Sequence, residues 1–428
     1  MYLMVIAFFV LIKCTFILKT KDYLCLLINE IHKPINIELK FENIESNNIV
    51  NNILYIVQFI YNITLYVDLG GCNMLKKIIT VLSCAAILAS PISAVTMNAK
   101  TLPLFKGAEG CGALAGTNLT TTTYHVTNLN DSGKGSLRDA VNEPNRTIVF
   151  DVAGTINLKS ELAFKSNLII NGQTAPKGGI TVTGESSSFN KSQNDVIRYI
   201  RFREGVTGGE QKCSLYIDNA KNIMVDHVSI EFGKWDNLHM ENSSDVTIQY
   251  SIIADGIHSQ YSGAILQECD NLSIHHCLWA DNRTRNPKAK SNLQFANNII
   301  YNWEVCGFVG GHSSEDHYQD LLSNYFISGN KSSSTFIGEC TSSDHIYNSN
   351  NYFDGNKDGV LNGRLITNND ISKAQATVQA SPYVIPIVPI TLQDPTQAYN
   401  TVLNEAGDSL NRDSEDLSVI GKLKSLGK

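Results

Sequence analysis

The chain has 428 residues, of which 43% are hydrophobic and 18% charged, and its formal net charge is −7. So apolar and weakly charged a chain buries enough surface to fold, which excludes disorder for most of it. Its 30 Gly residues follow no strict period, which excludes a collagen-like protein. The acidic balance argues against nucleic acid as a partner.

The N-terminal region divides into two segments before the main domain. Residues 1–73 are rich in Ile, Leu, Asn and Tyr and lack turn chemistry, so we interpret them as an over-extended translation of upstream DNA or as a disordered segment. Residues 74–94 have the layout of a secretory signal peptide, with Lys76 and Lys77, then an apolar stretch, and then small residues that end at a cleavage site after Ala94. This layout predicts a secreted, extracellular protein that keeps no stable membrane association after cleavage. Residues 1–94 contain seven Lys or Arg and six acidic residues, so their removal would leave residues 95–428 with a net charge of −8.

Six of the ten cysteines lie in this main domain: Cys111, Cys213, Cys269, Cys277, Cys306 and Cys340. Their wide spacing, without a Cys-x-x-Cys pair, argues against a zinc site. Export makes disulfides possible, whereas Cys277, inside an apolar segment, has the character of a small core residue.

A repeat with a period near 25 residues begins at residue 190. Apolar, β-branched segments begin at Val196, Ile223, Val246, Leu272 and Leu293. Each segment is too short for a helix and rich in strand-forming residues, so we expect strands. A β-propeller blade is longer, so the period favours a solenoid, and we predict an all-β, right-handed parallel β-helix.

Aligning the repeats places polar residues in one column: Ser251, His276, Asn298, Asn324 and Asn351. Such a column predicts an internal ladder of side-chain hydrogen bonds along the solenoid axis. Near the C-terminus, residues 394–407 and 413–423 have the caps and apolar spacing of short helices. These helices should cover the last coil or pack along the side of the solenoid.

An ordered set of motifs resembles the secreted pectate lyases of polysaccharide lyase family one. The resemblance runs from about residue 103 to the C-terminus. It is carried by Leu104-Phe-Lys-Gly-Ala-Glu-Gly-Cys-Gly112, Val152-Ala-Gly-Thr-Ile156, Asn171-Gly-Gln-Thr-Ala-Pro176, Val225-Asp-His-Val-Ser229, Ile274-His-His276, Arg285-Asn-Pro-Lys-Ala-Lys290 and Ala398-Tyr-Asn-Thr-Val-Leu403. The resemblance implies a β-helix that cleaves polygalacturonate, an acidic plant cell-wall polysaccharide, by β-elimination, usually with calcium. We expect it to act as a monomer.

The same resemblance assigns Arg285 as the base that removes the C5 proton of a galacturonate. The unperturbed pKa of arginine is above about 12, so neighbouring cations must destabilise its charged form, and an alkaline optimum is expected. The remaining assignments are substrate binding by Arg283, Lys288, Lys290, His258 and His276. Support of the site is assigned to Asp226, His227, His275 and Pro287.

Calcium prefers carboxylate oxygens, and we expect Asp236 and Glu241 to be its ligands. Two positions depart from the family pattern. A family aspartate ligand falls on Cys213, and a family lysine falls near Ser262. The sequence therefore predicts an incomplete calcium site.

Three alternatives stay open at this point. A pectin lyase would act on methyl-esterified substrate without calcium, and the tryptophans near the motifs are Trp235, Trp279 and Trp303. A β-helical hydrolase of the polygalacturonase type needs paired carboxylates on adjacent coils, and its signatures are absent from the sequence. A β-helix that binds carbohydrate without cleaving it is the third.

Overall fold

The structure is a computed structural model that describes residues 23–27, 36–40, 102–258 and 260–428. The chain forms two units, Met1–Met97 and Asn98–Lys428. In the first unit, β1 (Tyr23–Leu27) pairs antiparallel with β2 (Asn36–Lys40). The predicted signal peptide, residues 74–94, lies outside the described residues. Among the described residues, no helix is long and apolar enough to cross a membrane.

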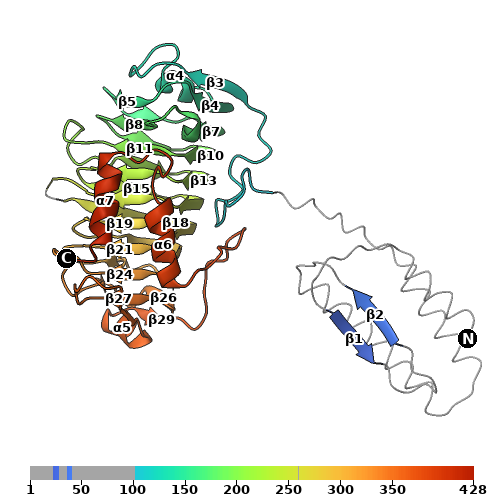
Figure 1. Ribbon diagram of the computed structural model, residues 1–428, viewed down its shortest axis with the longest axis vertical. Helices are drawn as coiled ribbons and strands as arrows, with labels where there is room; N and C mark the ends of the chain where they lie inside the picture. Colours follow the sequence, from blue (N-terminus) through green and yellow to red (C-terminus); the bar gives the residue numbers. More distant parts are fainter. Residues whose placement is uncertain (1–22, 28–35, 41–101, 259) are drawn as a thin grey trace, which may run out of the picture. The chain divides into compact units, whose positions relative to one another are not determined.

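The second unit is a parallel solenoid with three faces (Figure 1). Face A contains β6 (Leu162–Ala163), β9 (Ser187–Ser188), β12 (Leu215–Asp218), β15 (Asp236–Glu241), the first parts of β18 (Ser262–His275) and β20 (Lys288–Ala296), β22 (Phe308–Val309) and β25 (Ile337–Gly338). Face B contains β3 (Thr122–Val126), β4 (Arg146–Phe150), β7 (Leu168–Asn171), β10 (Gln193–Arg198), β13 (Lys221–Asp226), β16 (Ser244–Gln249), the second parts of β18 and β20, β23 (His317–Leu322), β26 (Asp344–Ser349) and β29 (Thr377–Val378). Face C contains β5 (Gly154–Asn157), β8 (Ile180–Thr183), β11 (Ile200–Arg203), β14 (Ser229–Glu231), β17 (Ile252–Ala254), β19 (Leu278–Ala280), β21 (Ile299–Tyr301), β24 (Tyr325–Ile327), β27 (Tyr352–Asp354) and β28 (Arg364–Leu365).

Neighbouring coils pair in parallel and in register, which confirms the predicted β-helix. On face B, Ile223 pairs with Val246, Val246 with Leu272, and Leu272 with Leu293. All four side chains are buried. Each coil thus places an apolar side chain directly over that of the preceding coil, and the stacked columns form the core.

From β10 onward, the turns from face B to face C are only one or two residues long, and they divide each predicted strand into two. In most of these turns the first residue has a positive φ, as in His227 (56°), Tyr250 (47°) and Asn297 (52°). The apolar pattern continues across so short a turn. The sequence therefore predicted one strand where the structure has two.

The second residue of these turns points into the solenoid and forms the predicted ladder. Asn298 N donates to Asn324 Oδ1 (2.9 Å), and Asn324 N donates to Asn351 Oδ1 (2.8 Å). The prediction was wrong by one residue for His276. Cys277 occupies that position, and its backbone N donates to Asn298 Oδ1 (3.0 Å).

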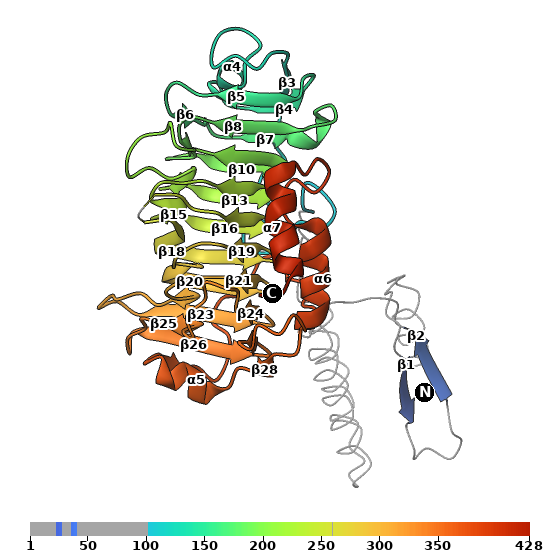
Figure 2. The ribbon, with the colours of Figure 1, turned by 60° about the vertical axis from the view of Figure 1, so that its left-hand side comes forward.

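Short helices cover the ends and one side of the solenoid (Figure 2). They are α4 (Leu137–Val141), the 3₁₀ turn η1 (Gly172–Thr174), α5 (Asn368–Lys373), α6 (Pro395–Glu405) and α7 (Ser414–Lys424). Leu137 of α4 and Ile371 of α5 belong to the main core cluster, whereas α6 and α7 pack along face C. Of the two arrangements expected for the C-terminal helices, packing along the side is the observed one.

The glycine-rich N-terminal motif lies across face B. Cys111 N donates to Ser273 Oγ (3.1 Å), and Gly112 N donates to Thr247 Oγ1 (2.9 Å). A Cβ at Gly112 would lie 2.2 Å from Ile223 O, so only glycine allows this close approach. The motif therefore has a structural role on face B.

The six cysteines of the second unit are free thiols with buried side chains. Burial raises the pKa of each of them, so they have the character of small core residues.

Candidate active site

The loops that run from face C to face A carry Arg285. We call them the C-to-A loops, and those on the coils around Arg285 comprise residues 204–214, 232–235, 255–258, 260–261, 281–287 and 302–307. Arg285 has a positive φ of 58°, and its carbonyl oxygen accepts from Ala264 N (2.8 Å). A Cβ at Gly263 would lie 2.4 Å from this oxygen, so glycine is required at that position.

Arg285 forms an ion pair with Asp236, which begins β15 two coils away. Arg285 Nη1 donates to Asp236 Oδ2 (2.9 Å) and Oδ1 (3.1 Å). The Asp236 side chain is fully buried, whereas 18% of the Arg285 side chain is exposed. Burial raises the pKa of Asp236, and the positive charge of Arg285 opposes this rise. The pair holds the guanidinium at the edge of face A with part of its surface in solvent.

A glutamine connects Arg285 to an exposed tryptophan. With the Gln260 amide oriented by its hydrogen bonds, its oxygen accepts from Arg285 Nη2 (3.0 Å) and from Trp235 Nε1 (3.1 Å). Trp235 is 38% exposed. The indole and the guanidinium therefore lie on either side of one amide oxygen.

The predicted basic residues lie close to Arg285 on β20 and in its loop. Lys288 Nζ lies 3.3 Å from His312 Nδ1. Burial lowers the pKa of Lys288, and the positive charge of Arg285 lowers it further. Lys290 is two residues along β20, on the same side of the strand, and Arg283 is in the loop before it, where its backbone N donates to Tyr261 O (2.8 Å). Arg285, Lys288 and Lys290 lie close enough for their charges to interact, and with Arg283 in the same loop they form a positive cluster that suits a polyanion.

Two further predicted residues belong to these loops. His258 is half exposed, with its Nε2 3.5 Å from Glu210 Oε2 on the loop two coils away. Pro287 lies next to the positive cluster, and its carbonyl oxygen accepts from Val309 N (2.9 Å).

The other predicted histidines lie at the far end of β18 from Arg285, and the substrate-binding assignment of His276 is wrong. His276 is 1% exposed, and its ring stacks on Tyr250 at 4.9 Å in the turn from face B to face C. A polymer cannot reach so buried a side chain. Burial lowers the pKa of His276 to about 4, which keeps the ring neutral. His275 is buried beside it, with the two Nδ1 atoms 2.9 Å apart.

Asp226 ends β13, and His227 begins the turn from face B to face C two coils before that of His276, where both support the fold. Arg198 Nε and Gln249 Nε2 each donate to the Asp226 carboxylate at 2.7 Å. Burial alone would raise the pKa of Asp226, but His227, Arg198 and Gln249 lower it below its usual value. His227 Nδ1 lies 2.9 Å from Asp226 Oδ1, and its ring stacks on Tyr250.

The predicted calcium ligands do not come together. Asp236 and Glu241 are five residues apart on β15, which separates them by about 16 Å along an extended strand. An odd spacing also places their side chains on opposite sides of the strand, and Glu241 Oε1 accepts instead from Gln267 Nε2 (3.1 Å).

The residues beside Asp236 do not complete a calcium site either. Ser262 pairs with Asp236 in the sheet, and the same register places Cys213 on its other side. Burial and the Asp236 charge raise the pKa of Cys213 to about 12, so it stays a neutral thiol, which is a poor calcium ligand. Within the described residues, no group of three or more His, Cys, Asp or Glu side chains is arranged to hold a metal. We therefore assign calcium no role in the chemistry below.

The sequence reasoning missed a histidine–carboxylate pair on the outer side of face A. His239 Nδ1 lies 2.8 Å from Asp218 Oδ1. Burial alone would lower the pKa of His239, but Asp218 raises it above its usual value. The sequence contains a signal for the position of His239. Side chains along residues 236–241 alternate between the two sides of the strand, so the odd-numbered positions lie opposite to Leu238 and Met240.

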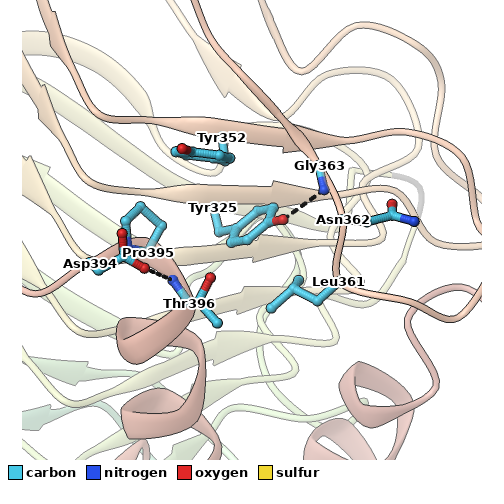
Figure 3. Close-up of a pocket in the computed structure, with 8 residues that line it drawn as sticks. All are labelled: Tyr325, Tyr352, Leu361, Asn362, Gly363, Asp394, Pro395 and Thr396. Carbon is cyan, nitrogen blue, oxygen red and sulfur yellow. Dashed lines mark hydrogen bonds between the residues drawn. The ribbon is translucent and has the colours of Figure 1, made fainter.

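A pocket of about 180 Å³ lies between β24, β27 and the start of α6 (Figure 3). It is lined by Tyr325, Tyr352, Leu361, Asn362, Gly363, Asp394, Pro395 and Thr396. Tyr325 Oη accepts from Gly363 N (2.8 Å), and Asp394 caps α6 by accepting from Thr396 N (3.0 Å). None of the predicted site residues lines this pocket.

Comparison with solved structures establishes the fold class. The cedar pollen allergen jun a 1 matches with a TM-score of 0.54 and 16% identity, covering 70% of this chain and 92% of the allergen. A pectate lyase bound to a hexasaccharide matches with a TM-score of 0.53 and 12% identity, covering 74% of this chain and all of that chain. The chain therefore shares its parallel β-helix fold with these two proteins.

Sequence relatives establish the family. The chain is 39% identical over 329 residues to a probable pectate lyase C from Aspergillus flavus, which covers 76% of this chain and 78% of that protein. It is 37% identical over 345 residues to a probable pectate lyase C from Aspergillus fumigatus, which covers 80% of this chain and 82% of that protein. No model of a known protein family matches the sequence. The chain belongs to the pectate lyase family.

Proposed function

We propose that this protein is a secreted lyase that cleaves polygalacturonate by β-elimination, with Arg285 as the base. The observation that carries the proposal is the position of Arg285, which is partly exposed at the edge of face A beside Lys288 in a chain of the pectate lyase family. The relatives that carry the name pectate lyase support this substrate class.

The reaction needs a base for one proton and positive charge near one carboxylate. Arg285, in its neutral form, takes the C5 proton of a galacturonate. The electron pair of the C5–H bond forms the C4–C5 double bond, the bond from C4 to the glycosidic oxygen breaks, and the departing oxygen takes a proton from solvent. Negative charge develops next to the substrate carboxylate during proton removal, and Lys288 and Lys290 stabilise it.

The charges around Arg285 act in opposite directions. Asp236 attracts the guanidinium in an ion pair, whereas the cation at Lys288 repels it. Substrate binding introduces a second carboxylate that competes for the same cations. Because the base must be neutral, we expect activity to rise with pH until Lys288 loses its proton.

The test measures the ultraviolet absorbance of the unsaturated product from polygalacturonate. Removing a general base costs about 10²- to 10⁴-fold, so R285K should lower kcat by at least about a hundredfold while keeping a cation beside Asp236. The matched control is R364K, because Arg364 is 52% exposed and pairs with Asp370 at the C-terminal end of the solenoid. Unfolding curves of both variants check the fold. A fully active R285K, or a wild-type protein without any unsaturated product, would contradict the proposal.

We also propose that the protein acts outside the cell as a monomer, after cleavage following Ala94. Mass spectrometry of the secreted protein should give an N-terminus at Val95, and size-exclusion chromatography with light scattering should give the mass of one chain. A retained Met74–Ala94 segment or a dimeric mass would contradict these points.

A further inference from the structure

The outer side of face A has charges of opposite sign on successive coils. The side chains at these positions form two columns, Tyr216–His239–Ile265–Lys288 and Asp218–Glu241–Gln267–Lys290. The earlier coils, β12 and β15, contribute two carboxylates, of which Asp218 pairs with His239 (2.8 Å), and β20 contributes two lysines. A polyanion crossing these coils therefore meets attraction over β20 and, from Glu241, repulsion over β15.

The charged side chains of the loops beside β15 do not reverse this difference in charge between the earlier coils and β20. Lys234 is buried and pairs with Glu210, with Nζ 3.1 Å from Oε1, and Nζ also donates to Gly208 O. His258 lies 3.5 Å from the other Glu210 oxygen. The exposed cation of this region is Lys212, whose carbonyl oxygen accepts from Trp235 N (2.9 Å), and the buried Glu204 lies close enough for their charges to interact.

Trp235 projects from the same side of the site. Of the three tryptophans, Trp279 and Trp303 are fully buried and Trp235 is 38% exposed. Its backbone is fixed at both ends, because its N donates to Lys212 O and its O accepts from Ser262 N (3.2 Å). Its indole is fixed by Gln260, which also holds Arg285. A rigid, exposed ring of this kind binds the apolar face of a sugar ring at low entropic cost.

We propose that Trp235 forms a subsite for an uncharged, methyl-esterified galacturonate next to the residue whose carboxylate is held by Lys288 and Lys290. This inference rests on the proposed lyase function and names its substrate as partly esterified pectate. Esterification removes the charge that Glu241 repels and adds a methyl group that can contact the indole. The free carboxylate over β20 is still required, because proton removal at C5 needs the positive cluster.

The experiment compares kcat/KM on polygalacturonate and on pectin esterified at about a third of its residues. Loss of an aromatic contact of about 1 kcal/mol corresponds to roughly a five- to tenfold change. W235A should therefore lower kcat/KM by about that factor more on the esterified polymer than on polygalacturonate. W235F keeps a ring but loses the bond to Gln260, so it should retain most of the preference for the esterified polymer.

Two further variants make the result specific. E241Q removes a repulsive charge and should raise kcat/KM on polygalacturonate, with a smaller effect on the esterified polymer. Y383A is the matched aromatic control, because Tyr383 is 51% exposed and stacks on Tyr318 over face B, so it should leave the ratio of the two kcat/KM values unchanged.

Equal losses on both polymers in W235A would overturn the inference and leave the proposed function intact. Absence of unsaturated product from either polymer would overturn the proposed function itself.

Discussion

At the scale of single residues, the site depends on one buried carboxylate. Asp236 is fully buried, and it is the counterion that positions Arg285 two coils away. The sequence motif predicts Arg285 as the base, and in the structure Arg285 lies beside Lys288. The pairing itself could not be predicted, because the left-handed backbone of Arg285 and the absence of a side chain at Gly263 determine where the guanidinium points.

We expect D236N to destabilise the protein by about 3 kcal/mol, because it leaves a partly buried guanidinium without its anion. Urea unfolding measures this change. The double variant D236N/R285Q removes both charges and should recover part of the loss. If the effects of D236N and R285Q simply add, the ion pair does not couple the two residues.

Lys288 should set the alkaline limit of activity. Burial and the charge of Arg285 lower the pKa of Lys288, so it loses its proton at a lower pH than an exposed lysine. The neutral amine no longer forms an ion pair with the substrate carboxylate. In K288R the cation persists at high pH. We therefore expect the falling limb of the pH profile of kcat/KM to move to higher pH in K288R and to stay in place in K373R, a variant of an exposed lysine of α5. An unchanged limb in K288R would exclude Lys288 as its origin.

At the scale of elements, the coil depends on its short turns. The ladder residue Asn324 donates from Nδ2 to Phe295 O and to Asn351 Oδ1 (both 2.8 Å), and its Oδ1 accepts from Asn298 N. The period and the Asn column were visible in the sequence. The exact turn position was not, because His276 and Cys277 are adjacent and only the backbone conformation shows that His276 points outward and Cys277 inward.

N324A should therefore cost about 3 kcal/mol, because it leaves several buried backbone and side-chain groups without partners. Chemical unfolding followed by circular dichroism measures the loss. N400A serves as the matched control, since Asn400 is exposed on α6 and alanine favours the helix. A loss below about 1 kcal/mol in N324A would show that solvent or neighbouring groups replace the ladder bonds.

At the scale of the whole solenoid, buried charges attach the C-terminal segment to face C. Arg201 Nη1 donates to Asp408 Oδ2 (2.7 Å), and Arg203 Nη2 donates to Asp413 Oδ1 (3.0 Å) and Asp416 Oδ1 (3.1 Å). Burial raises the pKa of Asp408 to about 6 and also raises that of Asp416, with the arginines opposing the rise in both. The sequence indicated the helices but not these ion pairs, because a solenoid strand does not reveal which distant segment covers it.

Buried carboxyls should make stability fall as pH rises from about 5 to 8, because together they outweigh the opposite contribution of His276, whose pKa burial lowers to about 4. Burial raises the pKa of Asp195 to about 7, and an acid whose pKa is raised in the folded state holds a proton that the unfolded chain releases. This contribution is complete below the unfolded pKa and is lost as pH rises to the folded pKa. Burial also raises the pKa of Asp408 to about 6, that of Glu204 to about 7 and that of Asp320 to about 6.

D195N tests this origin of the pH dependence, because an amide resembles the protonated acid and can still accept from Leu168 N (2.8 Å). Urea unfolding at pH 5 and pH 8 should show a smaller decline in D195N, by about 2 kcal/mol. D270N, at an exposed position, should decline like the wild type. A wild-type protein whose stability rises between these pH values would contradict the assignment.

The turns from face B to face C and the C-to-A loops differ in the changes of length that they tolerate during evolution. From β10 onward, a turn from face B to face C has one or two residues, and an insertion there would shift the ladder and the strand pairs after it. A C-to-A loop can lengthen or shorten while both flanking strands keep their register, as residues 204–214 and 232–235 already show. Mutation can therefore change the length of the loops that carry Trp235, Gln260 and Arg285 while the coils keep their strand pairs. New polymer preferences would arise in these loops, and the coils beneath them would stay the same.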